Sequence, residues 1–152
     1  MNKFIETYDN LRPEGMPSRE MVDHYHTRTE RHINSVRDYC RKIMRIDPGH
    51  YHELLDRMNI HDDSKFKEPE LTPYIWLTWR YKCRDNGEEY SCPDGMEDRM
   101  HDATVHHVKA NRHHPEFHDP SIEDPINRDN RDEPGHPIDA SGMNYIDIGR
   151  GS

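Results

Sequence analysis

The stretch NIHDDSKFKEPE, residues 59–70, places a histidine beside an aspartate, followed by a lysine and two glutamates. Neutral imidazoles give affinity for divalent metals, and a carboxylate next to them can bridge two ions. Lys65 lies three residues after the aspartate, so its ammonium would point into the same cleft and could hold a phosphate oxygen. This combination is typical of a metal site that can also hold a phosphate group.

The dipeptide His-Asp occurs three times, at residues 61–62, 101–102 and 118–119. The second copy lacks the lysine that follows the first. The third precedes a proline in a segment without helical periodicity. The sequence context therefore favours the copy at residues 61–62.

Apolar residues at three- and four-residue steps predict helices at about 18–44, 51–63 and 95–111, and another that follows EPELTP and ends near residue 84. No β-hairpin signal accompanies them, so the predicted fold class is all-α. The predicted inward-facing residues of the first two helices are Val22, Tyr25, Thr29, His32, Val36, Tyr39 and Ile43, then Leu54, Leu55 and Met58.

Histidine 32 lies in the middle of the first predicted helix, within its apolar face. Two antiparallel helices would bring His32 close to His61 and Asp62. A core histidine is the alternative for His32, and an ordinary helix-end pair is the alternative for the dipeptide. Lys65 could instead be a solvated lysine near a helix end. Glu70 is a candidate proton carrier, and capping of the third helix is its alternative.

The last predicted helix carries a second group of histidines. His107, Asn111 and His114 follow one another at four- and three-residue steps, which gathers them on one face if the helix persists. Pro115 disfavours helical backbone at His114, so His113 is an equally good candidate ligand. A solvated, titrating surface is the alternative for this group. Six further histidines are assigned to the surface: His24, His26, His50, His52, His118 and His136.

Composition limits the classes of function. The 152 residues predict a lead-in over 1–17, one helical domain over 18–114, and an extended or disordered arm over 115–152 that holds five prolines. The formal charge of −9 argues against binding to a nucleic-acid backbone, whereas 13 histidines fit a metal site. Three widely spaced cysteines, no leader-like segment and no membrane-length apolar run predict a cytoplasmic protein. A homo-oligomer is compatible with the sequence.

The order His32, then His61-Asp62, on successive helices resembles the HD-domain superfamily of metal-dependent phosphohydrolases. More narrowly, HDDSKFKEPELTPY followed by HHVKANRHHPEF resembles a group of small phage and bacterial HD-like proteins, over about residues 22–118. The residues that match this narrower pattern are His61, Asp62, Ser64, Lys65, Phe66, Glu70, Tyr74, His106, His107, Asn111, His113 and His114. The resemblance implies an HD-like helical bundle with one or two divalent ions.

The resemblance also implies roles for individual residues. The first ion would be held by His32, His61 and Asp62, and Asp62 would bridge to a second. The second ion would be held by the later histidines His107 and His113 or His114. Superfamily members close the metal shell with a later aspartate, whereas this chain reads YIDIGRGS at its end, so either Asp139 or Asp147 substitutes or that ligand is absent.

The predicted activity is hydrolysis of a nucleotide or another small phosphoester by a metal-activated water, with Asp62, Lys65 and Glu70 as the catalytic candidates. The sequence does not distinguish Mn, Fe, Zn, Co, Ni and Mg as the metal. A binuclear iron oxygenase of HD-like fold is one alternative. A non-catalytic, metal-stabilised interaction protein is another.

Overall fold

The computed structural model describes residues 3–9, 11, 15–119 and 121. This described part holds helices and no strand, which confirms the all-α prediction. In chain order the elements are α1 (Lys3–Asp9), α2 (Arg19–Ile46), α3 (Leu54–Ile60), the 3-10 helix η1 (Asp63–Phe66), α4 (Leu71–Asn86), α5 (Met96–Ala110) and α6 (Pro115–His118).

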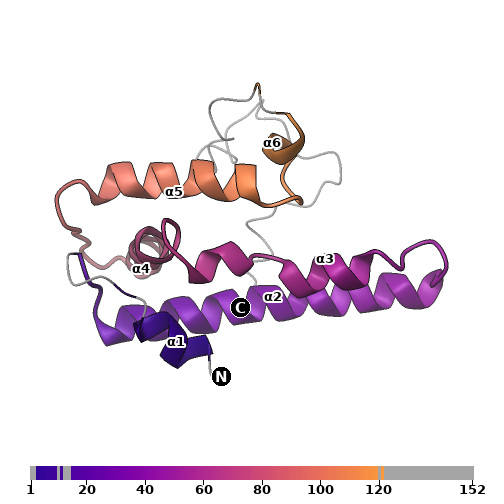
Figure 1. The fold of residues 1–152 in the computed structure, drawn as a ribbon. Helices are drawn as coiled ribbons and strands as arrows, with labels where there is room; N and C mark the ends of the chain where they lie inside the picture. Colours follow the sequence, from indigo (N-terminus) through magenta and orange to yellow (C-terminus); the bar gives the residue numbers. More distant parts are fainter. Residues whose placement is uncertain (1–2, 10, 12–14, 120, 122–152) are drawn as a thin grey trace.

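Helix α2 is the base on which α1, α3 and α4 pack (Figure 1). Ser18 caps its start, because the serine side chain accepts a hydrogen bond from the backbone N–H of Met21 at 3.3 Å. The helix ends at Ile46, where Asp47 and the following Pro48-Gly49 turn the chain back. Its 28 residues correspond to a rod of about 42 Å.

The core lies between the first half of α2 and helix α4, which appears nearly end-on between α2 and α5 in Figure 1. It closes because apolar residues recur on one face of each helix. Helix α5 covers α4 from the opposite side and contributes buried methionines. The buried apolar residues of these three helices include Met21, Val22, Tyr25, Leu71, Tyr74, Ile75, Met96, Met100 and Ala103.

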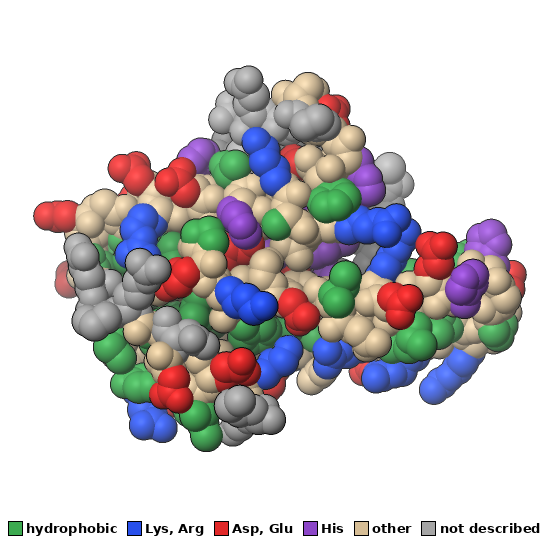
Figure 2. Space-filling model, in the orientation of Figure 1, with side chains coloured by type: hydrophobic (Ala, Val, Ile, Leu, Met, Phe, Trp, Pro, Cys, Tyr) green, Lys and Arg blue, Asp and Glu red, His purple; other side chains and the backbone are tan. Residues whose placement is uncertain are grey.

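The second half of α2 and helix α3 project beyond this core (Figures 1 and 2). Tyr39 and Ile43, which the periodicity predicts to face inward, are 54% and 39% exposed, and Leu55 is 46% exposed. The predictions for Tyr39 and Ile43 are wrong because α2 is longer than the elements that cover it, and the prediction for Leu55 is wrong because α3 packs mainly against α2 alone. Periodicity identifies residues on one face of a helix, but it does not show how far a partner extends along that face.

Helix α1 packs on the first half of α2 and covers His26. The His26 ring meets Phe4 and Phe66 edge-on, at centroid distances of 5.6 and 6.1 Å, and the residue is 7% exposed. The surface assignment of His26 is therefore wrong. The assignment fails because helix α1, which covers His26, lies in the lead-in, where no helix was predicted.

The predicted C-terminal arm begins with α6, a single helical turn started by Pro115 at its first position. The rest of the arm from residue 122 on, including His136, lies outside the described residues. Among the described helices, none combines the length and the apolar character needed to cross a membrane.

Candidate metal centre

The backbone breaks at the His61–Asp62 pair. Helix α3 ends at Ile60, before the predicted end near residue 63, and Asp62 has left-handed backbone with φ 59° and ψ 18°. Aspartate is one of the few side-chain-bearing residues that tolerates this conformation. The break between α3 and η1 leaves the Asp62 carboxylate facing inward, and the residue is fully buried.

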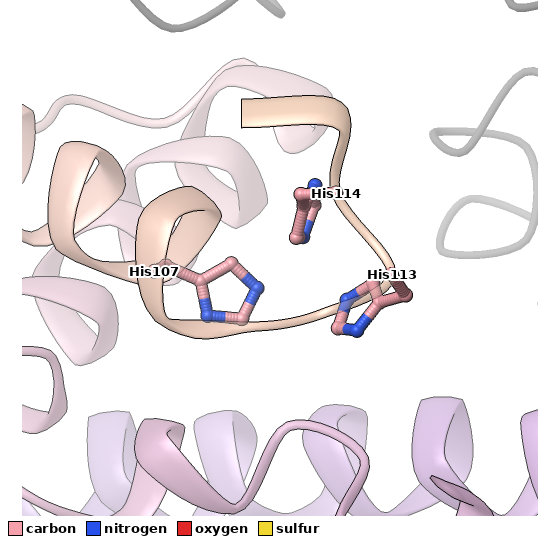
Figure 3. Close-up of side chains that lie close together, drawn as sticks. All are labelled: His107, His113 and His114. Carbon is pink, nitrogen blue, oxygen red and sulfur yellow. The ribbon is translucent and has the colours of Figure 1, made fainter. Parts of the chain in front are cut away.

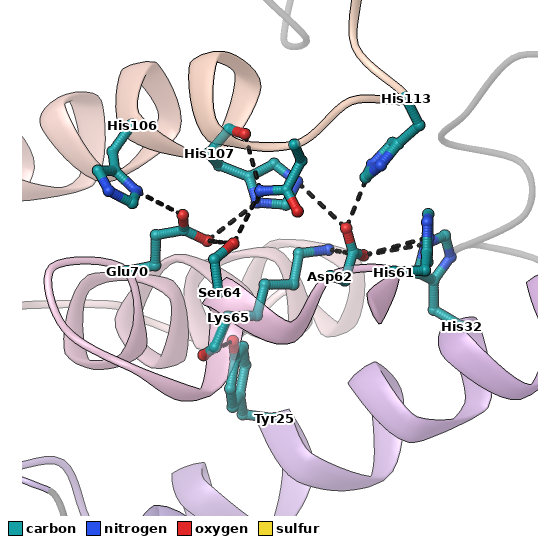
Figure 4. A network of polar contacts seen from close by, with 11 residues as sticks. Tyr25, His32, His61, Asp62, Ser64, Lys65, Glu70, His106, His107 and His113 are labelled. Atoms are coloured by element: carbon teal, nitrogen blue, oxygen red, sulfur yellow. Dashed lines mark hydrogen bonds and ion pairs between the residues drawn. The ribbon is translucent and has the colours of Figure 1, made fainter. Parts of the chain in front are cut away.

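One oxygen of Asp62 forms a triangle with two imidazoles (Figure 4). His32 reaches it from the middle of α2, and its Nε2 lies 3.2 Å from Asp62 Oδ2. His61 Nε2 lies 3.5 Å from the same oxygen and 3.1 Å from His32 Nε2. The structure therefore brings together the three residues predicted for the first metal.

The other oxygen of Asp62 faces the second histidine group. His113 Nε2 and His107 Nε2 lie 3.2 and 3.4 Å from Asp62 Oδ1, which is buried and accepts no hydrogen bond from the described residues. His114 completes a group with these two imidazoles, in which one nitrogen of each lies within 4.8 Å of the others (Figure 3). One carboxylate thus lies between two groups of potential ligands.

The second group is not built on a single helix face. Helix α5 ends at Ala110, and Asn111 has extended backbone, so the helix does not persist to His114. His113 and His114 instead lie in the loop before α6, and the loop turns back toward Asp62. His107 is on α5 and 1% exposed, so a solvated surface is the wrong description for it.

Lys65 contacts the same carboxylate. Its ammonium donates to Asp62 Oδ2 at 2.7 Å, and its side chain is 20% exposed. The backbone carbonyl of Lys65 accepts a hydrogen bond from the Tyr25 hydroxyl at 2.8 Å, which ties η1 to the core of α2. The lysine is therefore held at the cluster and is not an ordinary solvated residue.

Glu70 is fully buried on the far side of His107 from Asp62 (Figure 4). Its carboxylate accepts from His107 Nδ1 at 2.9 Å, from His106 Nδ1 at 2.6 Å and from the Ser64 hydroxyl at 3.0 Å. Glu70 occupies the N-cap position of α4, but its side chain makes no capping bond, so the capping alternative is wrong.

Ser64, His106 and Asn111 belong to this network but were not predicted as site residues. The Asn111 amide donates to the Ser64 hydroxyl at 2.7 Å, which joins the end of α5 to η1. All three lie in the two sequence stretches that carry the family resemblance. That clustering was the available signal, although it did not indicate which side chains would touch.

The protonation states fit metal ligands. Burial opposes ionisation of Asp62, but the Lys65 ammonium and the neighbouring imidazoles hold the pKa of its carboxyl well below its usual range. Burial lowers the pKa of His61 to about 4, against the opposing charge of Asp62. Burial also lowers the pKa of His107, although its bond to Glu70 opposes the shift. A charged carboxylate and neutral imidazoles are the forms that bind a metal ion.

The other two His–Asp pairs lie on the surface. His101 and Asp102 are exposed on α5, and the pair at residues 118–119 is exposed at the end of α6. The candidates for a closing carboxylate, Asp139 and Asp147, lie outside the described residues.

Fold and site together define an all-α protein whose histidine and aspartate groups could hold a metal ion. The chain belongs to the family described as "Family of unknown function (DUF5662)", which it matches over residues 21–144. This match covers α2 except its first two residues, continues through α6 and includes every described residue of the candidate site. No curated protein and no solved structure matches the chain. Because the family description carries no activity, the likeness to HD-domain phosphohydrolases stays a prediction.

Proposed function

We propose that this protein is a metal-dependent phosphohydrolase that acts on a nucleotide or another small phosphoester. The observation that carries the proposal is the triangle of His32, His61 and Asp62, with edges of 3.1, 3.2 and 3.5 Å. For bonds of about 2.1 Å, ligand atoms are about 3.0 Å apart around an octahedral ion and about 3.4 Å apart around a tetrahedral one. The triangle has the size that a shared ion requires.

The donor atoms also fit a cation chemically. Asp62 Oδ1 is buried and makes no hydrogen bond of good geometry with the described residues, although two imidazole nitrogens lie within 3.4 Å of it. A buried carboxylate oxygen without a good hydrogen bond is costly, and an ion between it and the imidazoles would remove that cost. The same carboxylate could then serve both groups of histidines.

The residues present favour a transition metal. Four imidazoles surround one carboxylate at 3.2–3.5 Å. Imidazole suits zinc, iron, copper and nickel, whereas magnesium prefers carboxylate, carbonyl and water oxygens. Magnesium is therefore the least suited of the metals that the sequence left open.

Lys65 would add a second positive charge beside the metal ion. A divalent ion held by these ligands would contribute Lewis acidity, which activates water and offsets charge on a phosphoryl group. The Lys65 ammonium lies next to this position and could stabilise a negatively charged phosphate oxygen. Asp62 offsets the positive charge of both, which keeps the cluster compatible with burial.

Elemental analysis of the purified protein, together with a phosphate-release screen over a nucleotide panel, tests the proposal. We expect about one or two transition-metal ions per chain and phosphate release that stops when a chelator removes them. A protein that takes up no metal at millimolar supply refutes the metal site. A fully loaded protein that releases phosphate from no member of a broad phosphoester panel refutes the hydrolase assignment.

The imidazole-rich set of donors also favours a second candidate, a binuclear iron oxygenase, because histidine suits iron. Oxygen consumption by the iron-loaded protein separates the two activities. If metal removal only lowers the melting temperature and neither assay responds, the ion is structural and the protein is a non-catalytic interaction protein.

A further inference from the structure

Glu70 is a buried carboxylate whose hydrogen bonds show where its partners carry their protons. Its carboxylate is 0% exposed and can only accept hydrogen bonds in its ionised form. Three potential donors, His107 Nδ1, His106 Nδ1 and the Ser64 hydroxyl, lie within 3.0 Å of its two oxygens, which is the surrounding of an ionised carboxylate. All three of these contacts must therefore place a hydrogen on the partner atom.

This requirement decides which nitrogen of His107 carries the proton. Nδ1 of His107 lies 2.9 Å from Glu70 Oε2 and must donate to it. Asn111 Nδ2 also lies 3.2 Å from this nitrogen, but its two amide hydrogens point to better acceptors. They go to the Ser64 hydroxyl at 2.7 Å and to the backbone carbonyl of His107 at 2.9 Å.

A neutral imidazole has one proton, so a hydrogen on Nδ1 leaves Nε2 of His107 with a lone pair. That nitrogen faces Asp62 Oδ1 at 3.4 Å, and both atoms are then acceptors. Two acceptors that face one another in a buried site repel unless a cation lies between them. In the other tautomer, Nε2–H could donate to Asp62 and would block a ligand position.

We infer that Glu70 is a positioning residue that fixes His107 as the Nδ1–H tautomer, so that the Nε2 lone pair is directed at the Asp62 carboxylate as a metal ligand. The metal-ligand half of this inference rests on the metal site of the proposed function, while the tautomer half stands on hydrogen bonds alone. It replaces the predicted proton-carrier role, because Glu70 contacts the back of the His107 ring. Hydrogen bonds from a metal-binding histidine to a carboxylate also raise the basicity of the ligand.

The same carboxylate fixes a second imidazole. His106 Nδ1 donates to Glu70 Oε1 at 2.6 Å, and the His106 side chain is 44% exposed. His106 therefore reports on the Glu70 oxygen that does not touch His107. The tautomers of a buried and a half-exposed histidine on the same carboxylate can therefore be compared within one protein.

The test is nitrogen-15 NMR of the imidazoles in metal-free protein, with metal affinity measured separately. Wild-type His107 should show the Nδ1–H tautomer. Glu70→Met removes every acceptor at similar size, so His107 should switch to Nε2–H and donate to Asp62, and metal affinity should fall about 10- to 100-fold. His106→Ala, the matched control, removes the other bond and should leave the His107 tautomer and the metal affinity unchanged.

Glu70→Gln keeps the test decisive if the methionine variant does not fold. The amide oxygen should remain with the two donors His107 and Ser64, so the NH₂ group should face His106 and switch that imidazole alone to Nε2–H. Wild-type His107 in the Nε2–H form, or no tautomer change at either histidine in both Glu70 variants, would overturn the inference. Correct tautomers in a protein that binds no metal would instead refute the proposed function and leave the tautomer half standing.

Discussion

The His-Asp dipeptide occurs at residues 61–62, at the backbone break between α3 and η1, and at residues 101–102, on the exposed surface of α5. Asp62 follows the end of α3, adopts left-handed backbone and is fully buried among imidazoles. Asp102 lies within α5, where regular helical backbone leaves it exposed. The difference shows that a backbone break, and not the dipeptide, turns a carboxylate inward. Substitutions at matched positions in the two pairs therefore test whether this difference in surroundings determines metal binding.

The largest effect is expected for Asp62→Asn. The amide keeps the size of the side chain but removes the charge that would offset the metal. Bound metal should fall sharply, and phosphate release should drop by about 100-fold or more. Asp102→Asn should change neither metal content nor turnover. Equal behaviour of the two variants would remove the distinction between the pairs.

Lys65→Met should have the next largest effect. Removing a cation beside the ligands should not weaken metal binding, because it removes a like charge from the neighbourhood of the ion. Turnover should fall by about 100-fold, since a charge directed at the phosphoryl group is lost. Lys109→Met, at an exposed position on α5, is the control. Loss of metal together with activity in Lys65→Met would indicate that the lysine only supports the ligands.

The double variant His113→Ala with His114→Ala tests the second group of histidines. These residues lie in a loop, so their removal should leave the helical core intact. Bound metal should fall to about half if two ions share Asp62, because the His32–His61 side keeps its own ligands. His50→Ala with His52→Ala, an exposed histidine pair near the end of α2, should leave the metal content at the wild-type level. Unchanged stoichiometry in the first variant would show that His113 and His114 hold no ion.

The smallest expected effect concerns stability without metal. Alanine tolerates left-handed backbone less well than asparagine, so Asp62→Ala should be less stable than Asp62→Asn by about 1 kcal/mol. Asp102→Ala should be more stable than wild type by about 0.5 kcal/mol, because alanine is the better helix former. Urea unfolding in the presence of a chelator measures both. Asp62→Ala as stable as Asp62→Asn would show that the backbone break does not need its aspartate.

Much of the fold could be predicted because its signals are local. Helix α2 begins at Arg19 and ends at Ile46, within two residues of the boundaries predicted for the first helix, and 95–111 closely matches α5. The exposure of Ile43 and Leu55 could not be predicted, because it depends on how far neighbouring helices extend. The burial of His26 depends on α1, a seven-residue helix that is too short to show a clear amphipathic pattern.

The sequence predicts which residues form the candidate site, but it does not predict which of their side chains touch. Residue types and order single out His61, Asp62 and Lys65, and the structure places these three beside one another. The role of Glu70 could not be derived from spacing, because three-dimensional packing decides which of its neighbours donate. Bonds to His106 and His107 span 36 and 37 residues of sequence.

The most direct test of the central claim is anomalous diffraction at the zinc absorption edge, from crystals of the protein grown with zinc. We expect a peak at about 2.0–2.2 Å from His32 Nε2, His61 Nε2 and Asp62 Oδ2. A second peak on the His107 and His113 side of Asp62 would add the bridging role. Density confined to exposed histidines such as His50 and His52, or no peak beside Asp62, would contradict the account.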